Sequence, residues 1–462
     1  MWLARGTLVC RDGKCDVDEM GTQVVGLSGA RALVMGLGVH GGGVGVARYL
    51  VGAGAHVHVT DMQSPDRLTT SVDALRDLPV GYTLGRHDSS DLDGIDFLVR
   101  NPGVPREAPF LREAEQRGVP IYMEMTLFFL ACPSRRIVAI TGTKGKTTTT
   151  TLTGEIFRRA GRDTVVAGNL RVSALGQLSR ITPTTDVILE LSSFQLEGLD
   201  AIRTSPGTAA VTNLMVDHLN RYPDMASYMD AKRRIFMYQD QSDVLLLNRD
   251  DAYADAFART APGRVEWFSP DGPLLGFGEP GSTWGGSHNL ANAHCASALA
   301  RASGIGEGAI AEAIRGFAGV PYRQEVVRVH RGVRYINDTT ATTPDATVVA
   351  LAAVAGPIVL LLGGADKGLD FTGLVSSLAD ARSRVTGIVL LEGSATDRLV
   401  AAIGDDRVRG RHRSFPDAVA QAARLAGNGA AVLLSPGCAS FGMFVNEFDR
   451  GDQFNALVQA MD

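Results

Sequence analysis

The sequence predicts an α/β protein of three domains, each with a mainly parallel sheet and helices. Three observations lead to this prediction. Short apolar runs, typical of buried strands, alternate with helical patterns along most of the chain. Glycine follows several of these runs, as it does where a parallel strand enters a ligand-binding turn. The chain has 462 residues, which exceeds a single domain of roughly 100–200 residues.

Residues 1–28 carry charged side chains throughout and no long apolar run, so they do not resemble a secretory signal. We interpret them as a poorly ordered extension or as residues upstream of the true start. Residues 29–133 form the first, Rossmann-like domain. Its expected strands are 32–35, 57–61 and 97–100.

Residues 134–319 form the expected central domain, which carries a phosphate loop. Its predicted strands are 137–140, 186–190, 208–212 and 243–247. Residues 320–462 form the last domain, which we expect to be Rossmann-like. Its predicted strands are 333–336, 357–362, 385–391 and 430–434. Three such domains predict a ligand site built between domains.

The composition of the chain bears on its binding partners and on its cellular compartment. The net charge of −5 gives no broad basic surface, which argues against nucleic acid as the main partner. No apolar run reaches about 18 residues, so we expect no membrane insertion. The five cysteines are scattered, odd in number and without a C-x-x-C pair, which favours reduced thiols in a cytoplasmic protein.

The strongest local motif is the glycine-rich loop Thr-Gly-Thr-Lys-Gly-Lys-Thr, which lies between a predicted strand and a helical pattern. Backbone N–H groups of such a loop close around phosphate oxygens, and the helix N-terminus adds positive potential. Lys146 would reach the β- and γ-phosphates, and the Thr147 hydroxyl would ligate Mg²⁺. The loop is shorter than the usual pattern, since Ile140 stands where the first glycine would be. The alternative is a turn with a solvated lysine.

Two further groups of residues follow central-domain strands. Glu190 ends an apolar strand, where a carboxylate is costly unless it is paired or bound to a metal such as Mg²⁺. An ordinary strand-end acid is the alternative. The second group follows the strand ending at Thr212 and contains Asn213, Asp217, His218 and Lys232. A structural histidine and a solvated lysine are the alternatives there.

The first domain has a glycine loop at residues 36–41, directly after a predicted strand. Asp61 ends the next strand, at about the spacing of a ribose-binding acid. A single pattern of this kind fits a nucleotide diphosphate as well as NAD.

Together and in this order, the motifs resemble the Mur ligases, and within them the branch that adds glutamate. The most diagnostic stretch is Glu-Leu-Ser-Ser-Phe-Gln-Leu-Glu at 190–197. The resemblance covers about residues 30 to 460. The other matching positions are Asp217-His218, Arg221-Tyr222-Pro223, Ala231-Lys232, His288-Asn289, Asn292, Tyr322-Arg323, Asn337-Asp338, Gly363-Gly364, Asp366-Lys367 and Ser435-Pro436 through Ser440.

The resemblance implies an ATP-dependent amide ligase of peptidoglycan precursor synthesis. It would join UDP-N-acetylmuramoyl-L-alanine and D-glutamate through an acyl phosphate, as a monomer. It would use two Mg²⁺ ions, one on Thr147 and Glu190 and one on His218, with a carbamylated Lys232 beside the second. The catalytic residues would be Lys146, Glu190, His218 and Lys232.

The resemblance also implies three sets of binding residues. ATP would be held by Gly142, Thr143, Lys144, Gly145, Lys146, Thr147, Thr148, Asn289, Asn292, Arg323 and Asp338. The nucleotide sugar would be held by Gly38, Val39, His40, Asp61, Gly103 and Asn169. Glutamate's carboxylates would be held by Thr342, Lys367 and Ser440.

Some positions depart from the family pattern. Thr340 stands where a lysine is common, and Gly442, Val445 and Glu447 replace an expected Asp, Lys and aromatic residue. These departures surround the amino-acid site, so a sibling ligase that uses L-glutamate stays open. A third reading belongs to another class, a non-catalytic nucleotide-binding protein or an NAD enzyme. It leaves Lys146, Glu190, His218 and Lys232 unexplained.

Overall fold

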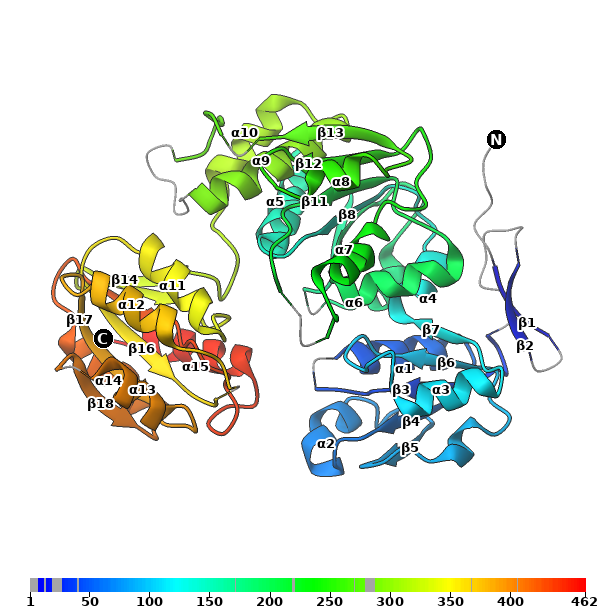
Figure 1. The fold of residues 1–462 in the computed structure, drawn as a ribbon, viewed down its shortest axis with the longest axis horizontal. Coiled ribbons are helices and arrows are strands. Elements are labelled where there is room, and N and C mark those ends of the chain that lie inside the picture. The colour runs from blue at the N-terminus through cyan, green and yellow to red at the C-terminus, as the bar shows by residue number, and fades with distance from the viewer. Residues whose placement is uncertain are drawn as a thin grey trace. The chain divides into compact units, whose positions relative to one another are not determined.

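The computed structural model describes residues 7–11, 14–18, 27–39, 41–170, 172–217, 221–269, 271–278, 287–366, 368–404 and 406–462. The chain divides into two compact units. The first comprises Met1–Phe277 and Ser287–Gly316, and the second Gly278–Gly286 and Phe317–Asp462. Three large sheets run through them, two in the first unit and one in the second (Figure 1).

The first large sheet has the strand order β5-β4-β3-β6-β7, and every pairing in it is parallel. Its strands are β3 Arg31–Met35, β4 His56–Asp61, β5 Val80–Leu84, β6 Phe97–Arg100 and β7 Ile121–Met123. The connecting helices are α1 Gly42–Gly52, α2 Pro65–Asp73, η1 Ser89–Leu92 and α3 Pro109–Gln116. The two edge strands were not predicted, because β5 is half-buried and β7 has three residues.

The central sheet has the order β13-β12-β11-β8-β10-β9 and is also parallel throughout. Its strands are β8 Ile137–Thr141, β9 Thr164–Gly168, β10 Asp186–Glu190, β11 Thr208–Val211, β12 Val244–Asn248 and β13 Arg264–Phe268. Its main helices are α4 Glu124–Ala131, α5 Lys146–Arg159, α7 Met225–Arg233, α8 Ala254–Ala258, α9 Ser287–Ala302 and α10 Glu307–Gly316. Short helical turns are η2 Leu175–Arg180, α6 Ser193–Leu196 and η3 Glu197–Ile202.

The first and central sheets share one hydrophobic core. The α4 side chains Phe128 and Phe129 are fully buried in it, together with residues of both sheets such as Val99 and Val187. These two layers are therefore packed as a continuous body.

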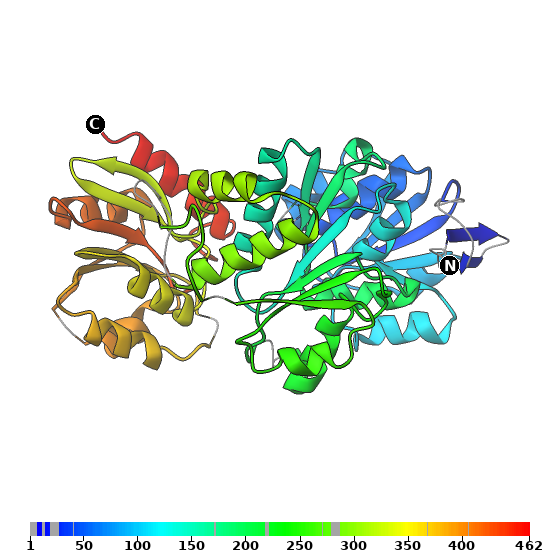
Figure 2. The same cartoon turned by 90° about the horizontal axis from the view of Figure 1, so that it is seen from above.

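The third sheet has the order β14-β15-β19-β16-β17-β18. Its strands are β14 Glu325–His330, β15 Val333–Asn337, β16 Ile358–Gly363, β17 Val385–Leu391, β18 Val408–His412 and β19 Ala431–Leu434. Only β14 is antiparallel. Helices α11 Pro344–Ala353, α12 Thr372–Asp380 and α13 Thr396–Ile403 cover one face, and α14 Phe415–Leu425 and α15 Glu447–Gln459 the other (Figures 1 and 2). The predicted α/β class with mainly parallel sheets is confirmed.

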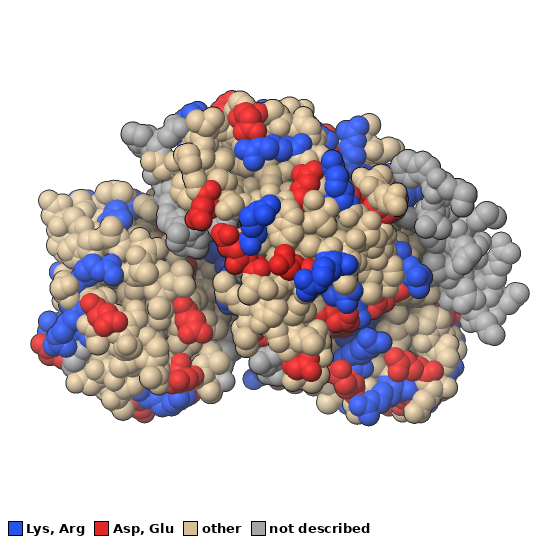
Figure 3. Space-filling view, turned by 45° about the horizontal axis from the view of Figure 1, so that its top comes forward, with Lys and Arg blue, Asp and Glu red and all other residues tan. Residues whose placement is uncertain are grey.

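At the N-terminal end, β1 Thr7–Arg11 and β2 Lys14–Asp18 pair as an antiparallel hairpin. The sequence did not predict this hairpin, because neither segment is a long apolar run. In the part of the chain that the structure describes, no helix is both long and apolar enough to cross a membrane. On the face drawn in Figure 3, basic and acidic side chains are interspersed rather than gathered into one basic area.

Candidate active site

The phosphate loop lies between β8, whose five residues are all buried, and the N-terminus of α5. Two positions of this loop have no room for a side chain and require glycine. A Cβ on Gly142 would lie 2.0 Å from Thr212 Oγ1, and one on Gly145 would lie 2.1 Å from Asn292 Oδ1. Both glycines also have positive φ, 144° and 81°, which side chains rarely adopt. The loop backbone therefore packs directly against the segment after β11 and against α9.

Hydrogen bonds fasten this loop to the end of β11. The Thr143 amide donates to Asn213 O at 2.8 Å, and the Lys144 amide donates to Asn213 Oδ1 at 2.9 Å. Thr212 Oγ1 donates to Lys144 O at 2.6 Å. Asn213 is thus an anchor of the loop.

The predicted phosphate-contacting residues begin α5. Lys146 Nζ donates to Gly142 O at 3.0 Å and to Thr143 O at 2.9 Å, so its ammonium lies over the loop. Thr147 and Thr148 are half-buried in the first turn of α5. A helix N-terminus preceded by a glycine loop binds phosphate through its N–H groups and dipole, and a lysine there adds a full positive charge. The arrangement fits a nucleotide triphosphate.

Glu190 lies at the end of β10, directly beside Ile140 of β8. Its side chain is 1% exposed. Asn169 Nδ2 donates to Glu190 Oε1 at 2.7 Å, whereas the buried Oε2 has no hydrogen-bond partner among the described residues. Such an oxygen is costly unless a cation or donor compensates it, and Mg²⁺ prefers oxygen ligands. The Glu190 carboxylate therefore fits a Mg²⁺ ligand better than an ordinary strand-end acid.

A capping box fixes the chain just after Glu190. Ser192 Oγ accepts a hydrogen bond from the Gln195 amide at 3.2 Å, and Gln195 Oε1 accepts one from the Ser192 amide at 3.1 Å. This reciprocal pair begins α6 and satisfies two backbone donors. The Ser-Ser-Phe-Gln stretch thus ends the strand sharply and holds Glu190 at the sheet edge.

Lys232, on α7, is 1% exposed. Its Nζ donates to Gly142 O at 2.8 Å and lies 4.7 Å from the centre of the Tyr228 ring. Burial, with the charge of Lys146 adding to it, lowers the pKa of Lys232 well below its ordinary value, although Asp217 and Glu190 oppose this. The alternative of a solvated lysine is therefore wrong. Burial thus favours the neutral, nucleophilic form of this amine.

Asp217 and the predicted metal ligand His218 belong to the cluster that follows β11. Asp217 lies 3.5 Å from the Lys144 ammonium, at the edge of the phosphate loop. His218 falls outside the described residues, so its role stays a prediction. No group of three His, Cys, Asp or Glu side chains suited to a metal gathers in the described part. Thr147, Glu190 and Lys232 therefore stay predicted metal-site residues.

Two predicted ATP-binding asparagines come from α9, which packs along α5. Asn292 Oδ1 lies 3.5 Å from Thr149 Oγ1 of α5, and Asn292 Nδ2 lies 3.5 Å from Asn289 Oδ1. The structure therefore places Asn292 beside the phosphate loop, with Asn289 next to it. Their contact with ATP stays a prediction.

Asp61 braces the glycine loop of the first sheet. Its Oδ2 accepts a hydrogen bond from the Gly38 amide at 3.0 Å, and its Oδ1 accepts one from the Gln63 amide at 2.8 Å. Ser71 Oγ donates to Gly38 O at 2.6 Å. Val39 packs partly buried against the core, and His40 falls outside the described residues. Both Asp61 oxygens thus already accept backbone hydrogen bonds, which sets the shape of the loop.

In the second unit, Asp338 follows β15. Ser435 Oγ donates to its Oδ2 at 2.8 Å, and the Gln324 amide donates to its Oδ1 at 3.2 Å. Burial raises the pKa of Asp338 from 3.8 to about 7, against the lowering effect of these hydrogen bonds and of Arg323. Asp338 is thus a buried carboxyl, and its predicted contact with ATP stays a prediction.

The predicted amino-acid-binding loops of this unit lie side by side. The Ala365 amide donates to Ala439 O at 2.9 Å and the Ala439 amide to Ala365 O at 3.1 Å, which joins the loop after β16 to the loop after β19. The Gly437 amide donates to Ala341 O at 2.8 Å, next to Thr342. Ser440 is buried in the same cluster, and Lys367 falls outside the described residues.

Sequence reasoning missed Arg450, which is completely buried in α15. Its Nε donates to Thr339 Oγ1 and its Nη2 to Thr339 O, both at 2.9 Å, so it holds the turn before Thr342. No local signal marked it, because an arginine in a helix is usually solvated. The departure at Thr340 is accommodated in the same turn, since its hydroxyl donates to Tyr322 O at 2.9 Å.

Comparison with known families gives three matches in chain order. The model of the Mur ligase MurD-like N-terminal domain matches residues 30–123, the Mur ligase middle domain 140–270, and the Mur ligase glutamate ligase domain 322–438. Together these matches cover most of the chain.

Relatives match nearly end to end. The chain is 45% identical to the UDP-N-acetylmuramoylalanine–D-glutamate ligase of Roseiflexus sp. (strain RS-1), over 94% of this chain and 99% of the relative. It is 36% identical to the enzyme of the same name from Alkaliphilus metalliredigens (strain QYMF), over the same shares.

Among solved structures, UDP-N-acetylmuramate-alanine ligase MurC from Thermotoga maritima is similar with a TM-score of 0.62. It is 18% identical and covers 93% of this chain and 99% of its own. MurF ligase from Thermotoga maritima in complex with ADP gives a TM-score of 0.55 at 15% identity, covering 87% and 95%. At these identities the likeness concerns the fold.

Proposed function

The chain belongs to the Mur ligase family, and from this premise we propose how its residues carry out the reaction. It is an ATP-dependent amide ligase that adds D-glutamate to UDP-N-acetylmuramoyl-L-alanine in peptidoglycan precursor synthesis. The names of the most similar relatives favour D-glutamate over the L-glutamate alternative. An NAD enzyme or a non-catalytic nucleotide-binding protein is not supported by any of these relatives.

One observation carries the mechanism. Lys232 Nζ lies 2.8 Å from Gly142 O of the phosphate loop, and the uncompensated Glu190 oxygen lies on the strand beside β8. A cation-binding carboxylate, a nucleophilic lysine and a phosphate cradle thus share one strand-end edge. Such an edge of a parallel sheet is where ligands bind.

The reaction proceeds in two steps. The alanyl carboxylate of the nucleotide sugar attacks the γ-phosphorus of ATP, which forms a C–O–P acyl phosphate and releases ADP. The neutral amine of glutamate then attacks the carbonyl carbon, an amide forms, a proton is lost, and phosphate leaves with the oxygen that had been in the carboxylate. Catalysis rests on positioning and charge neutralisation, as in phosphoryl transfer generally.

The phosphate loop supplies much of this positioning. Gly142, Thr143, Lys144, Gly145 and Thr148 present the loop and the first turn of α5 to the phosphates. Lys146 offers a full positive charge there, now directed at loop carbonyls. The residues proposed to bind ATP also include Asn289, Asn292, Arg323 and Asp338.

Thr147 and Glu190 would hold one Mg²⁺, and His218 a second beside Lys232. Bound there, Mg²⁺ supplies positive charge against the transferring phosphoryl group. The buried Glu190 Oε2, which lacks a hydrogen-bond partner in the described chain, is the feature that fits this ion. Asn169 orients the Glu190 carboxylate through the other oxygen.

We propose that Lys232 is carbamylated. Its neutral amine adds to CO₂ and loses a proton, which gives an N-carboxylate. The lowered pKa of Lys232 supports this step, because only the unprotonated amine reacts. The product is a buried carboxylate that can bind a cation.

The substrate-binding residues follow from the same premise. The nucleotide sugar would be held by Gly38, Val39, His40, Asp61, Gly103 and Asn169. D-glutamate would be held by Thr342, Lys367 and Ser440. The Ala365–Ala439 pairing joins the loops after β16 and β19, and the hydrogen bond from the Gly437 amide to Ala341 O joins the loop after β19 to the turn that contains Thr342. We further propose a cytoplasmic monomer, with domain boundaries near residues 133 and 319, between α4 and β8 and between α10 and β14.

An isotope experiment tests the acyl phosphate. With ¹⁸O in the alanyl carboxylate of the nucleotide sugar, one ¹⁸O should appear in the released phosphate and depend on glutamate. Phosphate without ¹⁸O would contradict the two-step route, because the carboxylate oxygen would then not have attacked phosphorus.

A further inference from the structure

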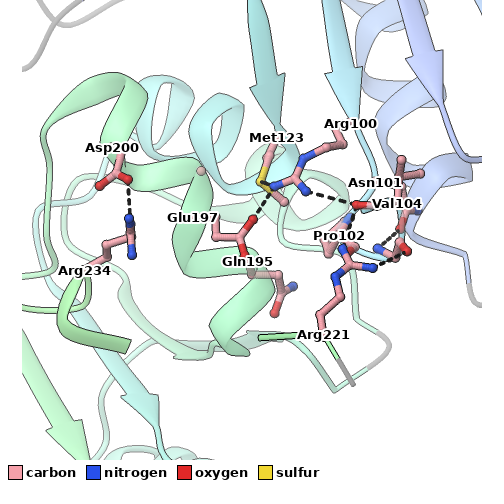
Figure 4. Close-up of polar contacts among 12 residues, drawn as sticks. Arg100, Asn101, Pro102, Val104, Met123, Gln195, Glu197, Asp200, Arg221 and Arg234 are labelled. Atoms are coloured by element: carbon pink, nitrogen blue, oxygen red, sulfur yellow. Dashed lines mark hydrogen bonds and ion pairs between the residues drawn. The ribbon is translucent and has the colours of Figure 1, made fainter. Parts of the chain in front are cut away.

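Arg221, which follows a strand of the central sheet, donates hydrogen bonds to the backbone of a loop that follows a strand of the first sheet (Figure 4). Its Nη2 donates to Val104 O at 2.7 Å and to Pro102 O at 3.3 Å, and its Nη1 donates to Gly103 O at 3.2 Å. The loop follows β6 of the first sheet, whereas Arg221 follows β11 of the central sheet. A planar guanidinium can serve several carbonyl groups at once, which an ammonium does with less geometric control.

A second, buried connection lies beside these hydrogen bonds. Arg100 at the end of β6 forms an ion pair with Glu197 of the central layer at 2.6 Å, with side chains 5% and 13% exposed. Tyr222 OH donates to the other Glu197 oxygen at 3.1 Å. Arg100 Nη1 also donates to Val104 O at 3.0 Å. Val104 is therefore held by two arginines, one from each sheet.

The loop of residues 101–104 lies against the glycine loop of residues 36–41 in the first sheet. Asn101 Oδ1 accepts a hydrogen bond from the Gly103 amide at 2.9 Å. A Cβ on Gly36 would lie 2.9 Å from Asn101 Cβ and 2.9 Å from Val104 Cγ2. A shift of residues 101–104 would therefore disturb the glycine loop that the nucleotide sugar is proposed to contact.

Aromatic contacts connect Arg221 to helix α7, which carries Lys232. The Arg221 guanidinium lies 5.1 Å from the Phe194 ring, and Tyr222 stacks on Phe194 at 5.7 Å. Tyr222 also contacts Tyr228 of α7, with ring centres 5.5 Å apart. Tyr228 is the residue over whose ring Lys232 Nζ lies. The contacts thus run without a gap from the loop after β6 to Lys232.

We propose that Arg221 is a positioning residue for the nucleotide sugar, an inference that rests on the proposed function. By holding residues 101–104 against the strand-end segment of the central sheet, it sets the distance between the site for the uridine diphosphate and the edge where the carboxylate meets ATP. The two ends of this substrate bind to different sheets. A small relative displacement therefore moves the carboxylate out of attack distance.

The same surface offers a matched control. Arg221 and Arg234 both line one hollow of about 480 Å³. Arg234 pairs with Asp200 at 2.5 Å (Figure 4) and with Asp230 at 3.1 Å. Both partners belong to the central layer. Removing Arg234 therefore costs ion pairs without releasing the first sheet.

The test compares Arg221→Met, Arg221→Lys and Arg234→Met in the full chain. Phosphate release should show kcat/KM for the nucleotide sugar lowered about 10- to 100-fold in Arg221→Met, as expected for a displaced reactant. The KM for ATP should stay within about twofold, and Arg221→Lys should lose less. Arg234→Met should lower the melting temperature while keeping kcat/KM within about threefold.

Hydrogen exchange provides a readout that does not need activity. In Arg221→Met, the amides of Asn101, Gly103 and Val104 should exchange faster while those of β8 stay protected. Normal kcat/KM with unchanged exchange, or a loss equal to that of Arg234→Met, would overturn the proposal. If Arg221→Met does not fold, Arg221→Lys decides by the same two measurements. A wild-type protein that does not consume the nucleotide sugar would instead refute the proposed function.

Discussion

Asn169 Nδ2 donates a hydrogen bond to Glu190 Oε1 at 2.7 Å. The other carboxylate oxygen, Glu190 Oε2, is buried and has no hydrogen-bond partner in the described chain. The amide thus fixes the carboxylate and leaves one oxygen for a cation. Ligand-orienting contacts of this kind typically change metal affinity or activity by about 10- to 100-fold.

Asn169→Ala should therefore raise the Mg²⁺ concentration that gives half-maximal phosphate release by about 10- to 100-fold. Titration of Mg²⁺ at saturating substrates measures this. Asn169 is also proposed to contact the nucleotide sugar, and the two roles separate in the data. An altered KM for the nucleotide sugar with an unchanged Mg²⁺ dependence would rule out the orienting role.

Glu190→Gln should abolish most activity without lowering the melting temperature much. The substitution keeps the size of the side chain and an oxygen for Asn169, but it removes the charge that fits Mg²⁺. A carboxylate oxygen that is buried without a donor contributes no stability of its own. Activity within a few-fold of wild type would contradict the metal assignment.

Lys232→Ala should be nearly inactive and partly recovered by small carboxylates, which can occupy the place of the carbamate. In the unaltered protein, ¹³CO₂ should give a carbamate carbon signal in ¹³C NMR. Lys144→Ala is the matched control, because Lys144 is exposed and paired with Asp217. A signal that persists in Lys232→Ala but disappears in Lys144→Ala would place the modification elsewhere.

Asp338→Asn should change how stability depends on pH. Burial raises the pKa of Asp338 from 3.8 to about 7, so the folded protein binds this proton more tightly than the unfolded chain does. The associated stability is fully present below the unfolded pKa and is lost as pH rises toward about 7. At higher pH the Asn variant should gain on the order of a few kcal/mol relative to wild type, because no buried charge forms.

Melting temperatures of the two proteins at about pH 4 and about pH 8 measure this difference. ATP binding should weaken in Asp338→Asn, since Asp338 is proposed to contact the nucleotide. Parallel melting curves at both pH values would show that Asp338 does not titrate in this range.

Gly364→Ala should raise the KM for glutamate more than the KM for ATP. Gly364 has φ 135°, and a Cβ there would lie 2.3 Å from Ala439 O, within the pairing that joins the two proposed amino-acid loops. Gly373→Ala is the control, because a Cβ at Gly373 in α12 meets nothing within 4 Å. Equal KM changes for both substrates would separate this pairing from the glutamate site.

Much of the fold could be predicted because its central strands are continuous apolar runs. The strand 385–391 has the bounds predicted from the sequence, and all but one of its residues are buried. The strand β18 was missed, because at this sheet edge the sequence Val-Arg-Gly-Arg-His alternates exposed and half-buried positions. The strand β14, which is half-exposed and antiparallel, was missed for the same reason.

Part of the candidate site could also be predicted from local sequence, and part could not. The phosphate loop could be read locally, because positive φ at Gly142 and Gly145 requires glycine in a short stretch. Other features depend on residues far away in the chain. They are the hydrogen bond to Glu190, the burial of Arg450 and the hydrogen bonds that Arg221 donates. Long-range contacts of this kind leave no local pattern.

This chain joins D-glutamate to UDP-N-acetylmuramoyl-L-alanine at the expense of ATP. Phosphate release measured with each glutamate enantiomer tests it most directly. ADP, phosphate and amide product should form in equal amounts with D-glutamate, and none should form when glutamate or the nucleotide sugar is omitted. Release that prefers L-glutamate, or that proceeds without the nucleotide sugar, would contradict it.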